Sequence, residues 1–168
     1  MPSPMTAWSQ IFVKGPMIRL PRHSLAAVML LVAGAAAAHE GATGIVAERM
    51  NAMEDAAAQA KALVRALKAS SPNTANIRSQ AERIHAHAHD TMRMFPPGSN
   101  QGHTFAAPEI WTERGDFERL ARSYDAAAER LVNAATAQDL SEVRREFAAV
   151  RSQCLNCHEK FRVSRSGH

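Results

Sequence analysis

Two cysteines and one histidine have the residue types and the spacing for covalent cofactor chemistry. They lie in the run CLNCH as Cys154, Cys157 and His158. A Cys-x-x-Cys-His run is typical of c-type haem attachment, because both thiols bond to the haem vinyl groups and the histidine lies next to the iron. On a helix, i,i+3 and i,i+4 spacing brings all three side chains to one face. The run therefore predicts one haem c bound through both cysteines, with His158 as an iron ligand.

The same cysteine spacing is compatible with other chemistry, most of which the rest of the sequence disfavours. A thioredoxin-like redox motif accompanies a βαβ pattern, which this sequence lacks. A structural zinc site needs about four ligands, and the chain contains only 2 cysteines. A Cys154–Cys157 disulfide that staples a haem-free bundle stays open as an alternative hypothesis.

The elements that must position this run are predicted to be four amphipathic helices, because apolar residues recur every three or four positions. Pro and Gly separate the segments. They span about 42–69, 74–95 and 108–135, and a fourth begins near Asp139 as its N-cap. Gly115 and Asp116 indicate a break or kink in the third. Short connections then predict an all-α fold, an antiparallel four-helix bundle.

The predicted buried faces are rich in alanine. In the first helix we expect burial of Val46, Met50, Met53, Ala57, Ala60, Val64 and Leu67. In the last helix we expect burial of Leu140, Val143, Phe147, Val150, Cys154, Cys157 and Phe161. Because alanine buries little apolar area, such a core has room for a large apolar cofactor and gains stability from one.

Residues 1–38 have the features of a cleaved secretory signal. Arg19 and Arg22 precede an apolar stretch at 25–34, and small residues at 36–38 form a cleavage site. The apolar stretch is too short for the roughly 20 residues of a membrane span. We therefore expect a mature domain of residues 39–168 in the periplasm, without a membrane span. Met17 is a candidate for the natural start.

The basic character of the chain, with a net charge of +4, belongs mainly to this signal. Of the 20 basic residues, Lys14, Arg19 and Arg22 lie in it, whereas none of the 16 acidic residues does. In the remainder, basic side chains alternate with acidic ones and form no patch of one sign. Binding to nucleic acid is therefore not expected.

Four stretches of the sequence carry a resemblance to a known family. They are ERMNAM, MFPPGSN, PEIW and FAAVRSQCLNCHEKFR, and they follow one another over most of residues 40–162. In this order they resemble the class II cytochromes c, the cytochrome c-prime family and its low-spin relatives. The resemblance implies a four-helix bundle with the haem motif near the C-terminus, so a methionine ligand would come from upstream.

The resemblance also implies which residue faces the iron on the side opposite His158. The family's distal position falls four residues after a basic residue on the first helix, here Arg49, and this position is Met53. The low-spin relatives have a methionine at this position. A thioether ligand raises the reduction potential of the haem. Met50, one turn away, is a competing ligand. An open site, with Met53 only packing in the core, is the other alternative.

Three further residues acquire expected roles from the resemblance. Arg49 resembles a basic residue near a haem propionate, where charge pairing would hold it, although a solvated surface arginine is the alternative. Arg162 resembles a basic residue that borders the proximal pocket near His158. Trp111 resembles a residue that packs near the haem edge, with ordinary core burial as the alternative.

The run HAHAH, residues 85–89, is a second candidate for metal chemistry. His85 and His89 are i,i+4 and could chelate a metal, but two ligands make a weak site. His87 points away from both. We expect a solvated helix face, with use of one of these histidines as the sixth haem ligand as a minor alternative.

These expectations favour a periplasmic one-electron carrier whose iron is ligated by His158 and Met53. The alternative is a five-coordinate haem protein that binds nitric oxide or carbon monoxide. No turnover enzyme is expected. The expected partners are periplasmic redox proteins, and the family resemblance allows a homodimer through the first two helices.

Overall fold

The computed structural model describes residues 42–163, and these residues are almost entirely helical. The elements are α1 (Gly44–Lys68), α2 (Thr74–Asp90), the short 3-10 helix η2 (Thr91–Met94), α3 (Glu109–Thr112), α4 (Arg114–Thr136) and α5 (Leu140–Phe161). The part of the chain described contains no strand beyond an isolated bridge between Ala106 and Arg162. The four long helices confirm the predicted all-α four-helix bundle. The predicted signal, residues 1–38, lies outside the described residues.

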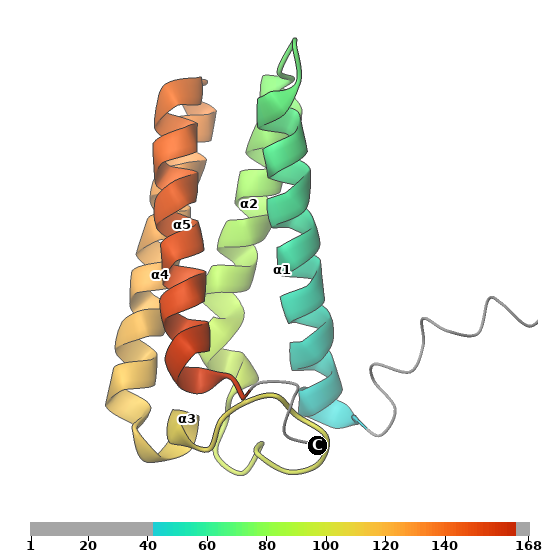
Figure 1. The fold of residues 1–168 in the computed structure, drawn as a ribbon, viewed down its shortest axis with the longest axis vertical. Coiled ribbons are helices and arrows are strands. Elements are labelled where there is room, and N and C mark those ends of the chain that lie inside the picture. Colours follow the sequence, from blue (N-terminus) through green and yellow to red (C-terminus); the bar gives the residue numbers. More distant parts are fainter. Residues whose placement is uncertain (1–41, 164–168) are drawn as a thin grey trace, which may run out of the picture. The chain divides into compact units, whose positions relative to one another are not determined.

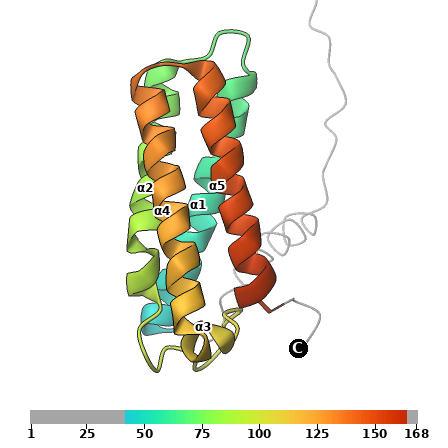
Figure 2. The same cartoon turned by 90° about the vertical axis from the view of Figure 1, so that its left-hand side faces the viewer.

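The four long helices form a bundle in which one pair of helices, α1 and α5, is not closely packed. α1 packs against α2, α2 against α4 and α4 against α5, whereas α1 and α5 make no comparable contact. Figure 1 shows these two helices standing apart, and Figure 2 shows the bundle from the side. Within residues 42–163, no helix is long and apolar enough to cross a bilayer. The first and last helices therefore border a space that other helices do not fill.

Two apolar clusters hold the bundle together. The larger one joins all four long helices and includes Leu63, Ile84, Leu131 and Val143. The second, beside α3, is built from Met94, Phe95, Ile110, Phe117 and Phe161. The ring of Phe117 meets Phe95 and Phe161 edge-on, with centroids 4.9 and 5.5 Å away. Such aromatic contacts are specific in geometry, so this cluster fixes one end of the bundle rigidly.

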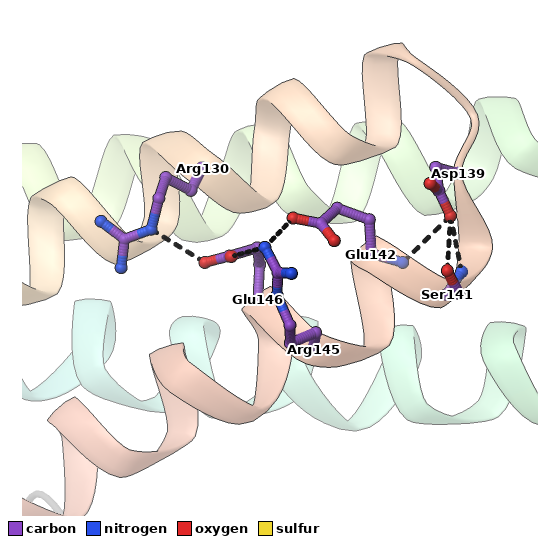
Figure 3. A network of polar contacts seen from close by, with 6 residues as sticks. All are labelled: Arg130, Asp139, Ser141, Glu142, Arg145 and Glu146. Atoms are coloured by element: carbon purple, nitrogen blue, oxygen red, sulfur yellow. Dashed lines mark hydrogen bonds and ion pairs between the residues drawn. The ribbon is translucent and has the colours of Figure 1, made fainter.

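Charged side chains tie α4 to the start of α5, as Figure 3 shows. The Asp139 carboxylate accepts the backbone N–H groups of Ser141 and Glu142, which confirms it as the N-cap. One turn later, Glu146 accepts from Arg130 Nε at 2.9 Å and from Arg145 Nη2 at 3.0 Å. These guanidinium groups cover the Glu146 carboxylate and hold its pKa below the ordinary value.

The second helix ends earlier than predicted. α2 stops at Asp90, and the chain continues to Met94 as a 3-10 helix. The Thr91 hydroxyl donates to the His87 carbonyl oxygen at 3.0 Å, a local bond that competes with the regular helical pattern. The tighter turn leaves the Met92 side chain exposed, instead of placing it on the buried face.

The break in the third predicted helix lies at Glu113, two residues before the expected position. Glu113 has φ −112° and ψ 46°, outside the helical region, whereas Gly115 lies within α4. Side chains on both sides of the break bond to the preceding loop: Trp111 Nε1 donates to the Pro96 carbonyl and Arg114 Nη1 to the Phe95 carbonyl, both at 2.8 Å. These long-range bonds, and not glycine, set the position of the turn.

The buried face of α1 also differs from the prediction. Val46 and Leu67 are buried as expected, but Arg49 and Leu63 are buried too, and Ala57 is exposed. Ala57 faces the open side between α1 and α5, where no helix covers it. The difference therefore follows from which helices are neighbours, a property that helical periodicity does not contain.

Candidate haem site

Two cavities that share lining residues lie in the space on the open side of the bundle. The first, which we call the Arg49 cavity, measures about 360 Å³. The second, the Tyr124 cavity, measures about 340 Å³. Both are lined by Met53, Ala57, Thr91, Cys157 and His158. Each volume falls within the usual range for cofactor sites.

The residues of the CLNCH run line this space from α5. Cys157 and His158 line both cavities, and Cys154 lines the Tyr124 cavity. The two thiols are half-buried and are not bonded to each other. Burial raises the pKa of both, that of Cys157 to about 11, with the neighbouring Cys154 as a smaller cause. The structure thus brings the predicted attachment residues to one face.

His158 lies at the rim, with one side exposed to solvent and the other lining the cavities. Loss of solvent on the cavity side lowers the pKa of His158, and the charge of Arg162 lowers it further. A lowered pKa favours the neutral imidazole, which is the form that binds metal. Position and charge state are therefore both compatible with the predicted iron ligand.

Both methionines proposed for the other side of the iron open onto the space. Met53 is half-buried and lines both cavities, whereas Met50 lines only the Arg49 cavity. Met53 also packs against the aromatic cluster, as does Cys157. Ligation by Met53, ligation by Met50 and an open site all stay predictions.

Arg49 is buried, with 3% of its surface exposed, and this excludes a solvated surface arginine. Its guanidinium donates to Met94 O at 3.3 Å, Ser99 O at 3.2 Å, Ser99 Oγ at 3.4 Å and Thr104 Oγ1 at 2.8 Å. It also lies 4.6 Å above the centroid of the Phe95 ring. No carboxylate within residues 42–163 pairs with it. A buried cation that lines the cavity and has only neutral partners is suited to an anionic group such as a carboxylate.

Arg162 follows the last residue of α5 and borders the Arg49 cavity beside His158. Backbone bonds fasten the loop before α3 here: Ala107 N–H donates to Phe161 O at 3.0 Å, and Val163 N–H to Phe105 O at 2.9 Å. The Arg162 guanidinium lies 5.8 Å from the Phe105 ring centroid. The loop thus closes one end of the cavity, next to the expected basic residue.

Trp111 is not among the residues that line either cavity. Its ring lies behind Phe95, with centroids 6.3 Å apart. Its bond to Pro96 holds the loop whose Ser99 and Met94 carbonyls accept from Arg49. Trp111 therefore supports the cavity wall in this structure, and the predicted contact with the haem edge stays a prediction.

The HAHAH run divides between the surface and the cavity. His85 and His89 approach the Asp125 carboxylate at 3.4 and 3.7 Å, and the described residues contain no group of three side chains placed to hold a metal. His87 instead lines the Tyr124 cavity beside Tyr124. The expected solvated face is therefore wrong for His87. A signal was present, because His87 is three residues after the buried Ile84.

The residues present fit a haem c. Two half-buried thiols that are not bonded to each other line these cavities, together with a histidine whose lowered pKa favours the neutral form. The surrounding side chains are mainly apolar. The guanidinium of Arg49, whose hydrogen-bond acceptors are neutral, lines the Arg49 cavity. Thioether bonds, an axial ligand, apolar packing and a carboxylate partner are what this cofactor requires of a protein.

Sequence comparison identifies relatives over the same region. The family model described as Cytochrome C' matches residues 44–162. A cytochrome c' of Pararhodospirillum photometricum is 31% identical over 115 residues, which cover 68% of this chain and 92% of the relative. A cytochrome c' of Allochromatium vinosum is 30% identical, over 54% of this chain and 62% of the relative.

Solved structures are similar in fold as well. A cytochrome c' described as having ligand-controlled dimer dissociation has a TM-score of 0.66 at 25% identity, over 71% of this chain and 95% of that one. Alcaligenes xylosoxidans cytochrome c prime, solved as a ferrous variant with bound nitric oxide, has a TM-score of 0.66 at 25% identity, over 72% and 94%. A carbon monoxide-bound variant matches at 0.66 and 26% identity, over 71% and 94%. With this fold and this attachment site, the chain belongs to the cytochrome c' family and carries one covalent haem c.

Proposed function

We propose that this chain binds nitric oxide or carbon monoxide at its haem iron, on the side opposite His158. The observation that carries the proposal is the apolar character of the Arg49 cavity, which Met50, Met53, Phe95, Ile110 and Phe117 line. A small, weakly polar ligand needs such a space. Structures of a relative with bound nitric oxide and bound carbon monoxide support the same function. A ferrous haem held by Cys154, Cys157 and His158 would supply the gas-binding chemistry.

The residues of the chain have distinct roles in this proposal. Cys154 and Cys157 fix the cofactor to α5, and His158 binds the iron from the rim. Arg49 pairs with a propionate, because it is a buried cation with only neutral partners. Arg162 controls access to His158 from the solvent side. Each role is one of binding or positioning, so we propose a binding protein and no turnover enzyme.

A second candidate function is one-electron transfer with Met53 as the sixth ligand. The observation that favours it is that Met53 lines both cavities together with Cys157 and His158. A methionine opposite a histidine raises the reduction potential. Its partners would then be periplasmic redox proteins.

Absorption spectra of the oxidised and reduced protein distinguish the two functions. For gas binding we expect a high-spin ferrous spectrum and immediate binding of carbon monoxide. A low-spin ferrous spectrum that becomes high-spin in Met53→Leu, but not in the control Met50→Leu, would support the electron carrier and contradict an open site. Leucine keeps the volume of the side chain, so a change of spin state reports ligation and not a cavity.

We also propose export to the periplasm with cleavage after residue 38, and translation from Met17. N-terminal sequencing of the precursor and of the mature protein tests both.

A homodimer through α1 and α2 is proposed on the basis of the relative with ligand-controlled dimer dissociation. Analytical ultracentrifugation with and without carbon monoxide measures it, and a monomer at all concentrations contradicts it.

A further inference from the structure

His87 and Tyr124 form a polar pair inside a mainly apolar cavity. His87 Nδ1 lies 3.2 Å from the Tyr124 hydroxyl, and the two rings meet edge-on with centroids 5.9 Å apart. His87 Nε2 is buried and has no hydrogen-bond partner among the described residues. Buried polar atoms are seldom left unpaired, because the lost solvation costs free energy. The pair therefore calls for a function beyond packing.

This pair lies in the cavity that also contains the haem attachment site. Cys154, Cys157 and His158 line the Tyr124 cavity from α5, opposite His87 on α2 and Tyr124 on α4. A cofactor attached through both cysteines occupies this space. The charge of the cofactor then acts on His87 through a medium of low dielectric constant, where an interaction between charges is much stronger than in water.

The surroundings of His87, taken together, favour the neutral form of its ring. Burial is the main cause that lowers the pKa of His87, and His158 lowers it further, whereas Asp55 of α1 and Asp90 of α2 oppose this. The other titratable or charged groups that line the cavity are Lys61, Tyr124, Arg151, Cys154, Cys157 and His158. Tyr124 stays a neutral phenol, because burial raises its pKa and Cys154 adds to the effect. Among the groups that titrate between about pH 5 and 8, His87 is the one fixed inside the cavity without taking part in attachment or ligation.

We propose that His87 takes up a proton when the haem is reduced, with Tyr124 holding the protonated ring. One electron from a redox partner or an electrode lowers the charge of the cofactor by one. One proton from solvent binds the unprotonated ring nitrogen, so the total charge in the cavity is unchanged. The protonated ring then donates from Nδ1 to the Tyr124 hydroxyl oxygen. The proposal rests on the haem c of this family and not on the identity of the sixth ligand.

The midpoint potential of the intact haem protein, measured by spectroelectrochemistry between about pH 5 and 8, tests this proposal. Proton uptake on reduction makes the potential fall as pH rises, by up to about 59 mV for each tenfold change in proton concentration. We call the pH range over which the potential falls the sloping segment. We expect it to be absent in His87→Gln, whose potential should not depend on pH there. His89→Gln is the matched control, two residues away on the same helix with its side chain 75% exposed, and it should leave the slope unchanged.

Tyr124→Phe provides an independent variant that keeps the ring and removes only the hydroxyl. Because the protonated form of His87 loses its acceptor, the segment should move to lower pH. An unchanged slope in His87→Gln, or an equal loss in His89→Gln, overturns the proposal. If His87→Gln does not attach haem, an unmoved segment in Tyr124→Phe overturns it. The absorption spectra that test gas binding are unaffected by these outcomes, so the two proposals can fail separately.

Discussion

Arg49 is a charged residue that the fold buries next to a cavity, with backbone carbonyls and hydroxyls as its only hydrogen-bond acceptors within residues 42–163. Two of its partners, Ser99 and Thr104, lie in the loop before α3, 50 and 55 positions later in the sequence, so the side chain also joins α1 to this loop. Burial lowers the pKa of Arg49, although an arginine stays protonated throughout the range in which proteins fold. At the scale of one residue, binding and stability therefore depend on the same guanidinium.

Replacing Arg49 tests this double role. We expect Arg49→Gln to lower the free energy of unfolding by about 1–3 kcal/mol, because buried acceptors lose charged hydrogen bonds. Urea unfolding of the haem protein measures the loss. Arg65→Gln, in the exposed last turn of the same helix, should change stability by less than about 0.5 kcal/mol. Equal effects of the two substitutions would contradict the burial of Arg49.

At the scale of elements, the contact between α4 and α5 combines apolar packing with the carboxylate of Glu146. The turn between the two helices is short, and Asp139 begins α5 by accepting two backbone N–H groups. Two helical turns after Asp139, Glu146 reaches back to Arg130 of α4 (Figure 3). Arg130 is 54% exposed and Arg145 70%, so solvent screens both interactions. The pair therefore contributes modestly to stability, but it fixes the register of the helix that carries the haem motif.

The pH dependence of this contact follows from the lowered pKa of Glu146. Its contribution is fully present above the pKa of the unfolded chain, about 4.3, and is lost as pH falls through the lower folded pKa. We expect Glu146→Gln to cost about 0.5–1 kcal/mol at neutral pH, with the difference from the parent protein vanishing in acid. Glu129→Gln, exposed on α4, is the control for urea unfolding at several pH values. A difference that persists in acid would contradict an ionic origin.

At the scale of the whole molecule, the two cavities lie where a contact between helices is missing. α1 packs on α2 and α5 on α4, but α1 and α5 do not pack on each other (Figure 1). Since the cavities between them are lined from both helices, a haem attached there would complete the bundle. A molecule that binds only the folded state stabilises it, and a covalent one does so permanently.

Loss of the covalent haem attachment should therefore destabilise some helices of the bundle more than others. In Cys154→Ala/Cys157→Ala, we expect faster hydrogen exchange in α1 and in the second half of α5 than in α2 and α4, which keep their mutual packing. Mass spectrometry of peptides from the haem-free variant measures this. Single substitution of Leu155, exposed between the two cysteines, is the control that keeps both thiols. A uniform loss of protection would show that the haem does not bridge the two helices.

Local sequence determined the features that depend on spacing alone. The limits of α1, the start of α5 at the Asp139 cap, and the common face of Cys154, Cys157 and His158 all follow from helical periodicity and capping. The presence of Met53 and Met50 on the side of α1 that faces the cavity follows in the same way, because successive side chains of a helix are separated by a constant angle. The haem attachment residues could therefore be named without a structure.

Tertiary structure alone decided which distant groups meet. Arg49 is buried because a loop about 50 residues later supplies its acceptors, and the break at Glu113 follows from bonds to Phe95 and Pro96. His87 meets Tyr124 across 37 positions of sequence, a partner that helical spacing does not identify. Spacing along one helix fixes a direction, but the group that a side chain meets in that direction depends on how the helices pack. The open side between α1 and α5, which makes room for the haem, belongs to that packing.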